Sequence, residues 1–186
     1  MRFTLIDRIV ELEPGRRIMA VKALSLAEEY LADHFPKFPV LPGVLMLEAM
    51  TQAAAWLVRA SEDFSHSMVV LKQASNIKYG HFVKPGQILT VTAEILSQTE
   101  QETKLKAQGK VEDRMTVGAR LVLERFNLAT SNPGRAFTDD IVKREMRSLF
   151  DLLWQPQGAG ASGAGQRSAA SEAPLNHEQR SASSST

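Results

Sequence analysis

The segment from Asp33 to Gln52, DHFPKFPVLPGVLMLEAMTQ, determines how the rest of the chain is interpreted. Its first half contains Pro36, Pro39 and Pro42. Each proline fixes its own φ and lacks a backbone donor, so this half is predicted to be a rigid loop. The Pro42-Gly43 step then suits the start of a helix, because proline is preorganised for a first helical turn.

The residues from Val44 to about Ala60 are apolar and form helices readily. Apolar side chains recur at helical spacing around most of the circumference, which is typical of a central, buried helix. Glu48 is the exception, with Gln52 one turn later on the same face. A carboxylate among apolar groups is unfavourable unless it is paired, hydrated or protonated, so Glu48 marks either a solvent-facing edge or a general acid. His34 favours the acid, since it is fixed among prolines and imidazole is the usual base near neutral pH.

These two residues belong to a longer motif, HFPxxPVxPGVLxxEAMxQ, which resembles the active-site segment of the FabZ-type β-hydroxyacyl-acyl-carrier-protein dehydratases. His34 and Glu48 are 14 positions apart, as in that family. The resemblance extends in weaker form from about Arg2 to Phe126. Asp33 departs from the glycine that the family commonly has before this histidine.

The resemblance implies removal of water from a (3R)-hydroxyacyl thioester on an acyl carrier protein, giving the trans-2-enoyl product in fatty-acid or related lipid biosynthesis. His34 would take the proton from C2, and Glu48 would protonate the departing C3 hydroxyl. The backbone N–H of Gly43, with Val44 beside it, would stabilise the thioester oxygen at the positive end of the helix. Gln52 either orients Glu48 or only packs there.

Phe35 and Phe38 are expected to line the acyl-binding tunnel, although such residues equally suit an ordinary core. The reaction needs no metal and no organic cofactor. The resemblance also implies an acyl carrier protein as partner and a homodimer, possibly a hexamer built as a trimer of dimers. In that family the histidine and the glutamate of one site come from different subunits.

Two alternatives stay open. The chain could be another hotdog acyl-thioester enzyme, such as a thioesterase, or a non-catalytic hotdog protein that binds acyl carrier protein. The presence of both His34 and Glu48 in this motif argues against each.

Composition is consistent with these expectations. The 186 residues are 44% hydrophobic, enough for one domain with a sizeable core. A net charge of +1 argues against nucleic-acid or membrane-surface binding. The chain has no cysteine, which excludes disulfides and thiolate chemistry and suits a cytoplasmic protein. Its N-terminus lacks the apolar run of a signal peptide, and no membrane span is expected.

Alternation of apolar and polar residues predicts the remaining elements. A hairpin is expected around the turn at Glu13–Arg16, followed by a short helix over 24–31 with Ser25 as a possible cap. Strands are expected over 68–71, 74–79, 87–97, 103–111 and 116–126. Antiparallel strands after one buried helix suggest an α+β domain whose sheet wraps around that helix. The resemblance implies the hotdog fold specifically.

The predicted organisation has three parts. Residues 1–128 form the hotdog domain. Residues 129–154 form a C-terminal helical extension, in which Thr138 or Asp139 caps a helix that ends at Leu153 or Trp154. We expect this helix to pack on the outside of the sheet or in an oligomer contact, more than against a partner. Residues 155–186 are rich in Gly, Ala, Ser and Gln and are expected to be a disordered tail.

Overall fold

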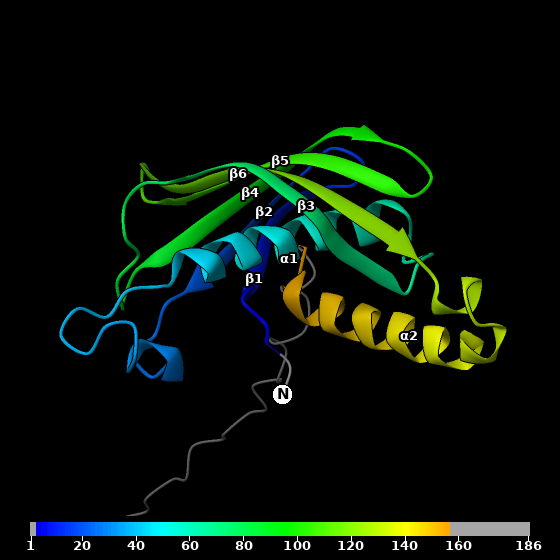
Figure 1. Cartoon of the computed structure of the whole chain (residues 1–186), viewed down its shortest axis with the longest axis horizontal. Coiled ribbons are helices and arrows are strands. Elements are labelled where there is room, and N and C mark those ends of the chain that lie inside the picture. Colours follow the sequence, from blue (N-terminus) through cyan, green and yellow to red (C-terminus); the bar gives the residue numbers. More distant parts are fainter. Residues whose placement is uncertain (1–2, 157–186) are drawn as a thin grey trace, which may run out of the picture. The chain divides into compact units, whose positions relative to one another are not determined.

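The computed structural model describes residues 3–156. In this part of the chain, six strands form one antiparallel sheet in the order β1-β2-β4-β5-β6-β3, with the long helix α1 along one face (Figure 1). The predicted sheet wrapped around a central helix is therefore confirmed. The elements are β1 (Arg8–Glu13), β2 (Arg17–Ala23), α1 (Gly43–Ser61), β3 (Met68–Tyr79), β4 (Ile88–Gln98), β5 (Glu102–Val111), β6 (Arg114–Phe126) and α2 (Ala136–Leu153). The tail predicted over 155–186 lies, from residue 157 onward, outside the described residues.

The core lies between the sheet and α1. Successive side chains of a strand point to opposite faces, so alternate residues of β4 and β6 meet the helix. On β6 these are the four apolar residues that the sequence places on one face, and each is at least 94% buried: Val117, Ala119, Leu121 and Leu123. From α1, Ala49, Met50, Ala53 and Leu57 are fully buried against them. The predicted central, buried helix is confirmed.

The sequence predicted two short strands where the structure has the single strand β3. It is one strand that pairs with β6, but its register shifts between Leu71 and Gln73 and again between Ser75 and Lys78. Asn76 has a φ of 52° at the second shift. Such bulges interrupt the alternation of side chains, which is why the sequence pattern appeared broken. Because β3 pairs with β6 alone among residues 3–156, it forms one edge of the described sheet.

The predicted hairpin is present as β1 and β2, but the predicted helix over 24–31 is wrong. Only a single 3₁₀ turn, η1 (Glu29–Leu31), forms there. Leu24 continues the pairing of β2, since its N–H donates to the Gln87 carbonyl at 3.0 Å and its carbonyl accepts from the Gly86 N–H at 2.8 Å. These bonds hold Leu24 in the sheet, so a helix cannot begin at this residue.

Helix α2 begins at Ala136, so the predicted capping role of Thr138 or Asp139 is wrong. The Asp139 side chain instead turns inward and is 97% buried. Its carboxylate accepts hydrogen bonds from the backbone N–H groups of Leu128 and Ala129, both at 2.8 Å, and from the Ser67 hydroxyl. Burial favours the neutral acid, but these three donors outweigh it and hold the pKa of Asp139 below its usual value.

The outer face of the sheet was one of the two placements predicted for helix α2, and that placement is wrong. The helix lies on the side of the sheet occupied by α1 (Figure 1). The Phe150 ring packs 6.1 Å from Trp56 of α1 and 5.3 Å from Phe64, just beyond α1. Helix α2 ends at Leu153, which confirms the predicted end at Leu153 or Trp154. The apolar face of α2 thus covers the aromatic rings of Trp56 and Phe64.

Candidate active site

The loop that carries His34 is closed by its own backbone. The N–H of Phe35 donates to the Phe38 carbonyl at 3.2 Å, and the N–H of Phe38 donates back to the Phe35 carbonyl at 2.9 Å. The Val40 N–H also donates to the His34 carbonyl at 3.0 Å. The half-buried His34 ring stacks on Phe35 with a centroid distance of 4.2 Å. These contacts fit the rigid loop that the prolines predict.

A second set of contacts anchors this loop to the segment after β3. The Leu41 N–H donates to the Val83 carbonyl at 2.9 Å. The Phe38 ring meets Phe82 edge to face at 5.7 Å, and the Lys84 ammonium lies 5.2 Å from the centre of the Phe38 ring. Phe35 and Phe38, predicted to line a tunnel, are 50% and 44% exposed and lie on the surface of this chain.

The first turn of α1 offers free backbone donors. The Pro42 carbonyl accepts from the N–H groups of Leu45 and Met46, at 2.9 and 3.1 Å, and no side chain caps the helix. The N–H groups of Gly43 and Val44 precede these bonds, where the helix dipole is positive. The structure thus places the two predicted oxyanion donors next to each other at the helix start.

Tyr79 lies beside the candidate site, and sequence reasoning missed it. Its ring lies against the start of α1, where a Cβ on Gly43 would come within 3.0 Å of the ring atom Cε1. Glycine at position 43 is therefore required for the ring to lie this close. Tyr79 itself is 52% exposed. The only sequence signal is an aromatic residue at the end of a strand, which is too common to point to a site.

Glu48 is held by Gln52. The amide nitrogen of Gln52 donates to Glu48 Oε1 at 2.9 Å and to the Phe3 carbonyl at 2.9 Å, and the amide oxygen accepts from the Leu5 N–H at 2.8 Å. Both side chains are half-buried. Gln52 therefore links the carboxylate of Glu48 to the N-terminal segment, a contact that the sequence alone did not reveal.

His34 and Glu48 are not joined within one chain. His34 precedes the helix, whereas Glu48 lies about one and a half turns inside it. Across residues 3–156, no hydrogen bond or ion pair links the two side chains. The structure brings together Gly43 with Val44 and Glu48 with Gln52, but it does not pair the predicted base with the predicted acid.

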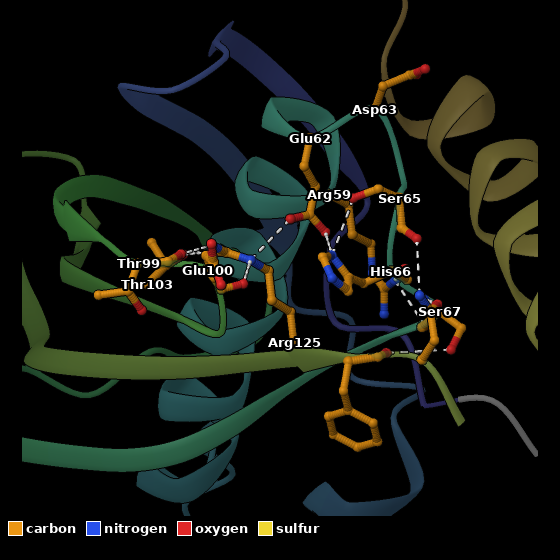
Figure 2. A network of polar contacts seen from close by, with 12 residues as sticks. Arg59, Glu62, Asp63, Ser65, His66, Ser67, Thr99, Glu100, Thr103 and Arg125 are labelled. Atoms are coloured by element: carbon orange, nitrogen blue, oxygen red, sulfur yellow. Dashed lines mark hydrogen bonds and ion pairs between the residues drawn. The ribbon is translucent and has the colours of Figure 1, made fainter. Parts of the chain in front are cut away.

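A separate polar cluster lies at the other end of α1 (Figure 2). Arg125 Nε is 3.1 Å from Glu62 Oε2, and Glu62 Oε1 is 2.9 Å from His66 Nδ1. Arg125 also donates to the Glu100 carbonyl at 3.1 Å. Nearby, burial lowers the pKa of Arg59, whose guanidinium donates to backbone carbonyls. The cluster ties the end of α1 to β6 and to the β4–β5 turn, which is a structural role.

Residues 3–156 lack two further features. No group of three or more His, Cys, Asp or Glu side chains there is arranged to hold a metal ion. None of the helices in the described part is long and apolar enough to cross a membrane.

Comparison with known proteins places the chain in a family. Residues 1–123 match the family described as FabA-like domain. The chain is 39% identical over 113 residues to the 3-hydroxyacyl-[acyl-carrier-protein] dehydratase FabZ of Ruminiclostridium cellulolyticum, covering 61% of this chain and 80% of that protein. It is 35% identical over 133 residues to the FabZ of Symbiobacterium thermophilum, covering 72% of this chain and 94% of that protein.

Solved structures support the fold. The dehydratase heterocomplex ApeI:P from Xenorhabdus doucetiae aligns with a TM-score of 0.57 at 17% identity, over 68% of this chain and 85% of that chain. The protein smu.793 from Streptococcus mutans, bound to acetyl CoA, aligns with a TM-score of 0.54 at 16% identity, over 68% and 94%. From its match over residues 1–123 and its relatives of known name, the chain belongs to the FabA-like family.

Proposed function

We propose that this protein is a 3-hydroxyacyl-acyl-carrier-protein dehydratase that converts (3R)-hydroxyacyl to trans-2-enoyl thioesters in fatty-acid biosynthesis. The observation that carries the proposal is the motif with His34 in a closed loop before α1 and Glu48 inside α1, in a FabA-like chain whose relatives bear this name. A thioesterase and a non-catalytic binding protein are not favoured by any feature of the site.

The elimination assigns one proton to each side chain. His34 takes the proton from C2, and the released electron pair forms the C2–C3 double bond. The C3 hydroxyl leaves as water after Glu48 gives it a proton. Negative charge that gathers on the thioester oxygen is stabilised by the free N–H groups of Gly43 and Val44. Exchange of protons with solvent then restores His34 and Glu48.

The active form in this proposal is a homodimer acting in the cytoplasm on acyl carrier protein. Strand β3 is an edge of the sheet and exposes Leu71, Ile77 and Tyr79, which suits pairing with a second copy. Since one chain does not join His34 to Glu48, each site would use His34 of one subunit and Glu48 of its partner. A trimer of such dimers is a further possibility for the complete assembly.

An assay with (3R)-hydroxyacyl carrier protein tests the reaction. Wild type is expected to form the conjugated enoyl product, and His34→Ala and Glu48→Gln to lose about 10²–10⁴-fold. The control is His66→Ala, at the far end of α1, which should stay active. Absence of enoyl product from wild type would contradict the proposal.

Mixing the two inactive variants tests the shared site. A random mixture of subunits that exchange partners would contain dimers with one intact site, giving about a quarter of wild-type activity. No recovery after subunit exchange, shown by mass-tagged subunits, would mean that each site uses residues of one chain.

A further inference from the structure

A pocket of about 410 Å³ lies between α1 and α2, and we call it the α1–α2 pocket. Its size falls in the range of small-molecule sites, roughly 300–1,000 Å³. One wall comes from α1 and the other from α2. The apolar side chains of these walls are Ala55 and Trp56 on α1 and Val142, Met146 and Leu149 on α2, and the polar ones are Gln52, Arg59 and Glu145.

The pocket is elongated along both helices. On α1 the lining runs from Gln52 to Arg59, and on α2 from Val142 to Leu149, a separation of seven positions in each case. Seven residues of α-helix span about 10 Å. Gln52 and Arg59 therefore mark the two ends on α1. The α1 residues between them are apolar, and the α2 wall is apolar except for Glu145. Arg59 is 92% buried and directs its guanidinium toward the Ser67 carbonyl at 3.1 Å, so it closes its end with a paired cation.

The other end lies next to the proposed chemistry. Gln52, which lines the pocket, donates to Glu48 Oε1 at 2.9 Å. The pocket thus begins one hydrogen bond away from the side chain that protonates the C3 hydroxyl. An acyl chain continues from C3 as methylene groups, and apolar surface next to it withdraws such groups from water.

We infer that the α1–α2 pocket receives the distal methylene groups of the acyl chain, and that α2 determines how long a chain the enzyme accepts. The inference rests on the proposed dehydratase function. Helix α2 begins after residue 123, where the match to the FabA-like family ends, so this wall lies outside the matched domain. Val142, Met146 and Leu149 act as specificity-determining residues.

Filling the pocket tests the inference. Leu149→Trp is expected to lower kcat/KM much more for long acyl chains than for short ones. The loss should be roughly fourfold for each methylene excluded, the equivalent of about 0.8 kcal/mol. Leu149→Ala should shift the preference toward longer chains. The control is Leu152→Trp, the same substitution three residues later at a position that is 69% exposed, which should keep the wild-type profile.

Two results would overturn the inference. An equal loss at every chain length would show that Leu149 matters only for stability. A change of oligomeric state in Leu149→Trp, measured by light scattering, would show that the pocket is a contact between subunits.

A labelling experiment separates this inference from the proposed function. Wild type is exposed to a pantetheine thioester whose acyl chain ends in a photoreactive group, and the labelled peptides are identified by mass spectrometry. The pocket is supported if residues 142–149 are labelled in wild type and in Leu152→Trp but not in Leu149→Trp. This result supports the pocket even if wild type dehydrates nothing and the proposed function fails. Labelling only elsewhere, in an enzyme that dehydrates its substrates, refutes the pocket.

Discussion

Replacement of Gln52 by methionine is expected to slow catalysis much more than it weakens substrate binding. The amide of Gln52 makes three hydrogen bonds, to Glu48 Oε1, the Phe3 carbonyl and the Leu5 N–H. Methionine has nearly the same length and fits the same space, but it donates no hydrogen bond. The Glu48 carboxyl group then loses the partner that orients it toward the C3 hydroxyl.

The hydrogen bonds of Gln52 set the size of the loss in rate and of the loss in stability. Glu48 acts as a neutral acid in the proposed step, and a hydrogen bond between neutral groups contributes about 0.5–1.5 kcal/mol, roughly 2- to 13-fold in rate. The partly buried Leu5 N–H loses its acceptor, which costs about 1–3 kcal/mol of stability. The exposed contact to the Phe3 carbonyl can be replaced by water and adds little.

The assay compares kcat, KM and their pH dependence in Gln52→Met with those in Thr51→Val, and urea unfolding gives the stability of each. Thr51 is the matched control, because its hydroxyl also bonds one turn back, to the Leu47 carbonyl at 3.0 Å, but it does not touch Glu48. We expect Thr51→Val to keep wild-type kcat. If Gln52→Met loses stability but keeps kcat and an unchanged pH profile, Gln52 only fastens the N-terminal segment and the positioning role is refuted.

Three further predictions concern stability, pH and the oxyanion donors. Arg125→Met should lower the free energy of unfolding by about 3 kcal/mol in urea titrations, because it removes the cation from the largely buried Glu62 carboxylate and leaves only His66 beside it. Lys72→Met, in an exposed ion pair, should leave the urea midpoint nearly unchanged. The folded-state pKa of Asp139 is depressed, so its contribution to stability is complete above the unfolded pKa of about 3.9 and is lost as the pH falls through the folded value. Asp139→Asn should therefore reduce the fall of the melting temperature at acid pH. An unchanged fall would contradict the assignment. Gly43→Ala should lower kcat/KM roughly tenfold to a hundredfold, because the new methyl group obstructs the thioester oxygen. The melting temperature should change little, because the half-exposed Tyr79 ring can turn aside. A wild-type kcat/KM would rule out close approach of the thioester oxygen to this glycine.

The sequence alone predicted the elements whose signals are local. The prolines before Gly43 and the apolar run after it predicted α1 nearly to the residue, since φ restriction and helical periodicity act over a few residues. Alternation likewise predicted β4, β5 and β6 within two residues at each end. The motif linking His34 to Glu48 indicated the family, because its residue types and spacing are read directly from the chain.

Local signals gave wrong answers where distant partners compete. Ser25 and Glu28 suggested a capped helix, but Leu24 bonds to residues 86 and 87 in the sheet. Asp139 has the residue type of a helix cap, yet the backbone N–H groups of the preceding loop and the Ser67 hydroxyl bind its carboxylate more favourably. In each case hydrogen bonds to residues remote in sequence replaced the local arrangement.

Only the tertiary structure decided how the candidate site is supported. Gln52 meets Leu5 and Phe3, which lie 47 and 49 positions earlier, and Tyr79 reaches Gly43 because β3 ends beside the start of α1. The placement of α2 against α1, which creates the pocket beside Gln52, was also decided at this level. Sequence periodicity shows that a side chain is buried or lies on a given face, but the topology of the sheet determines which distant residue it meets.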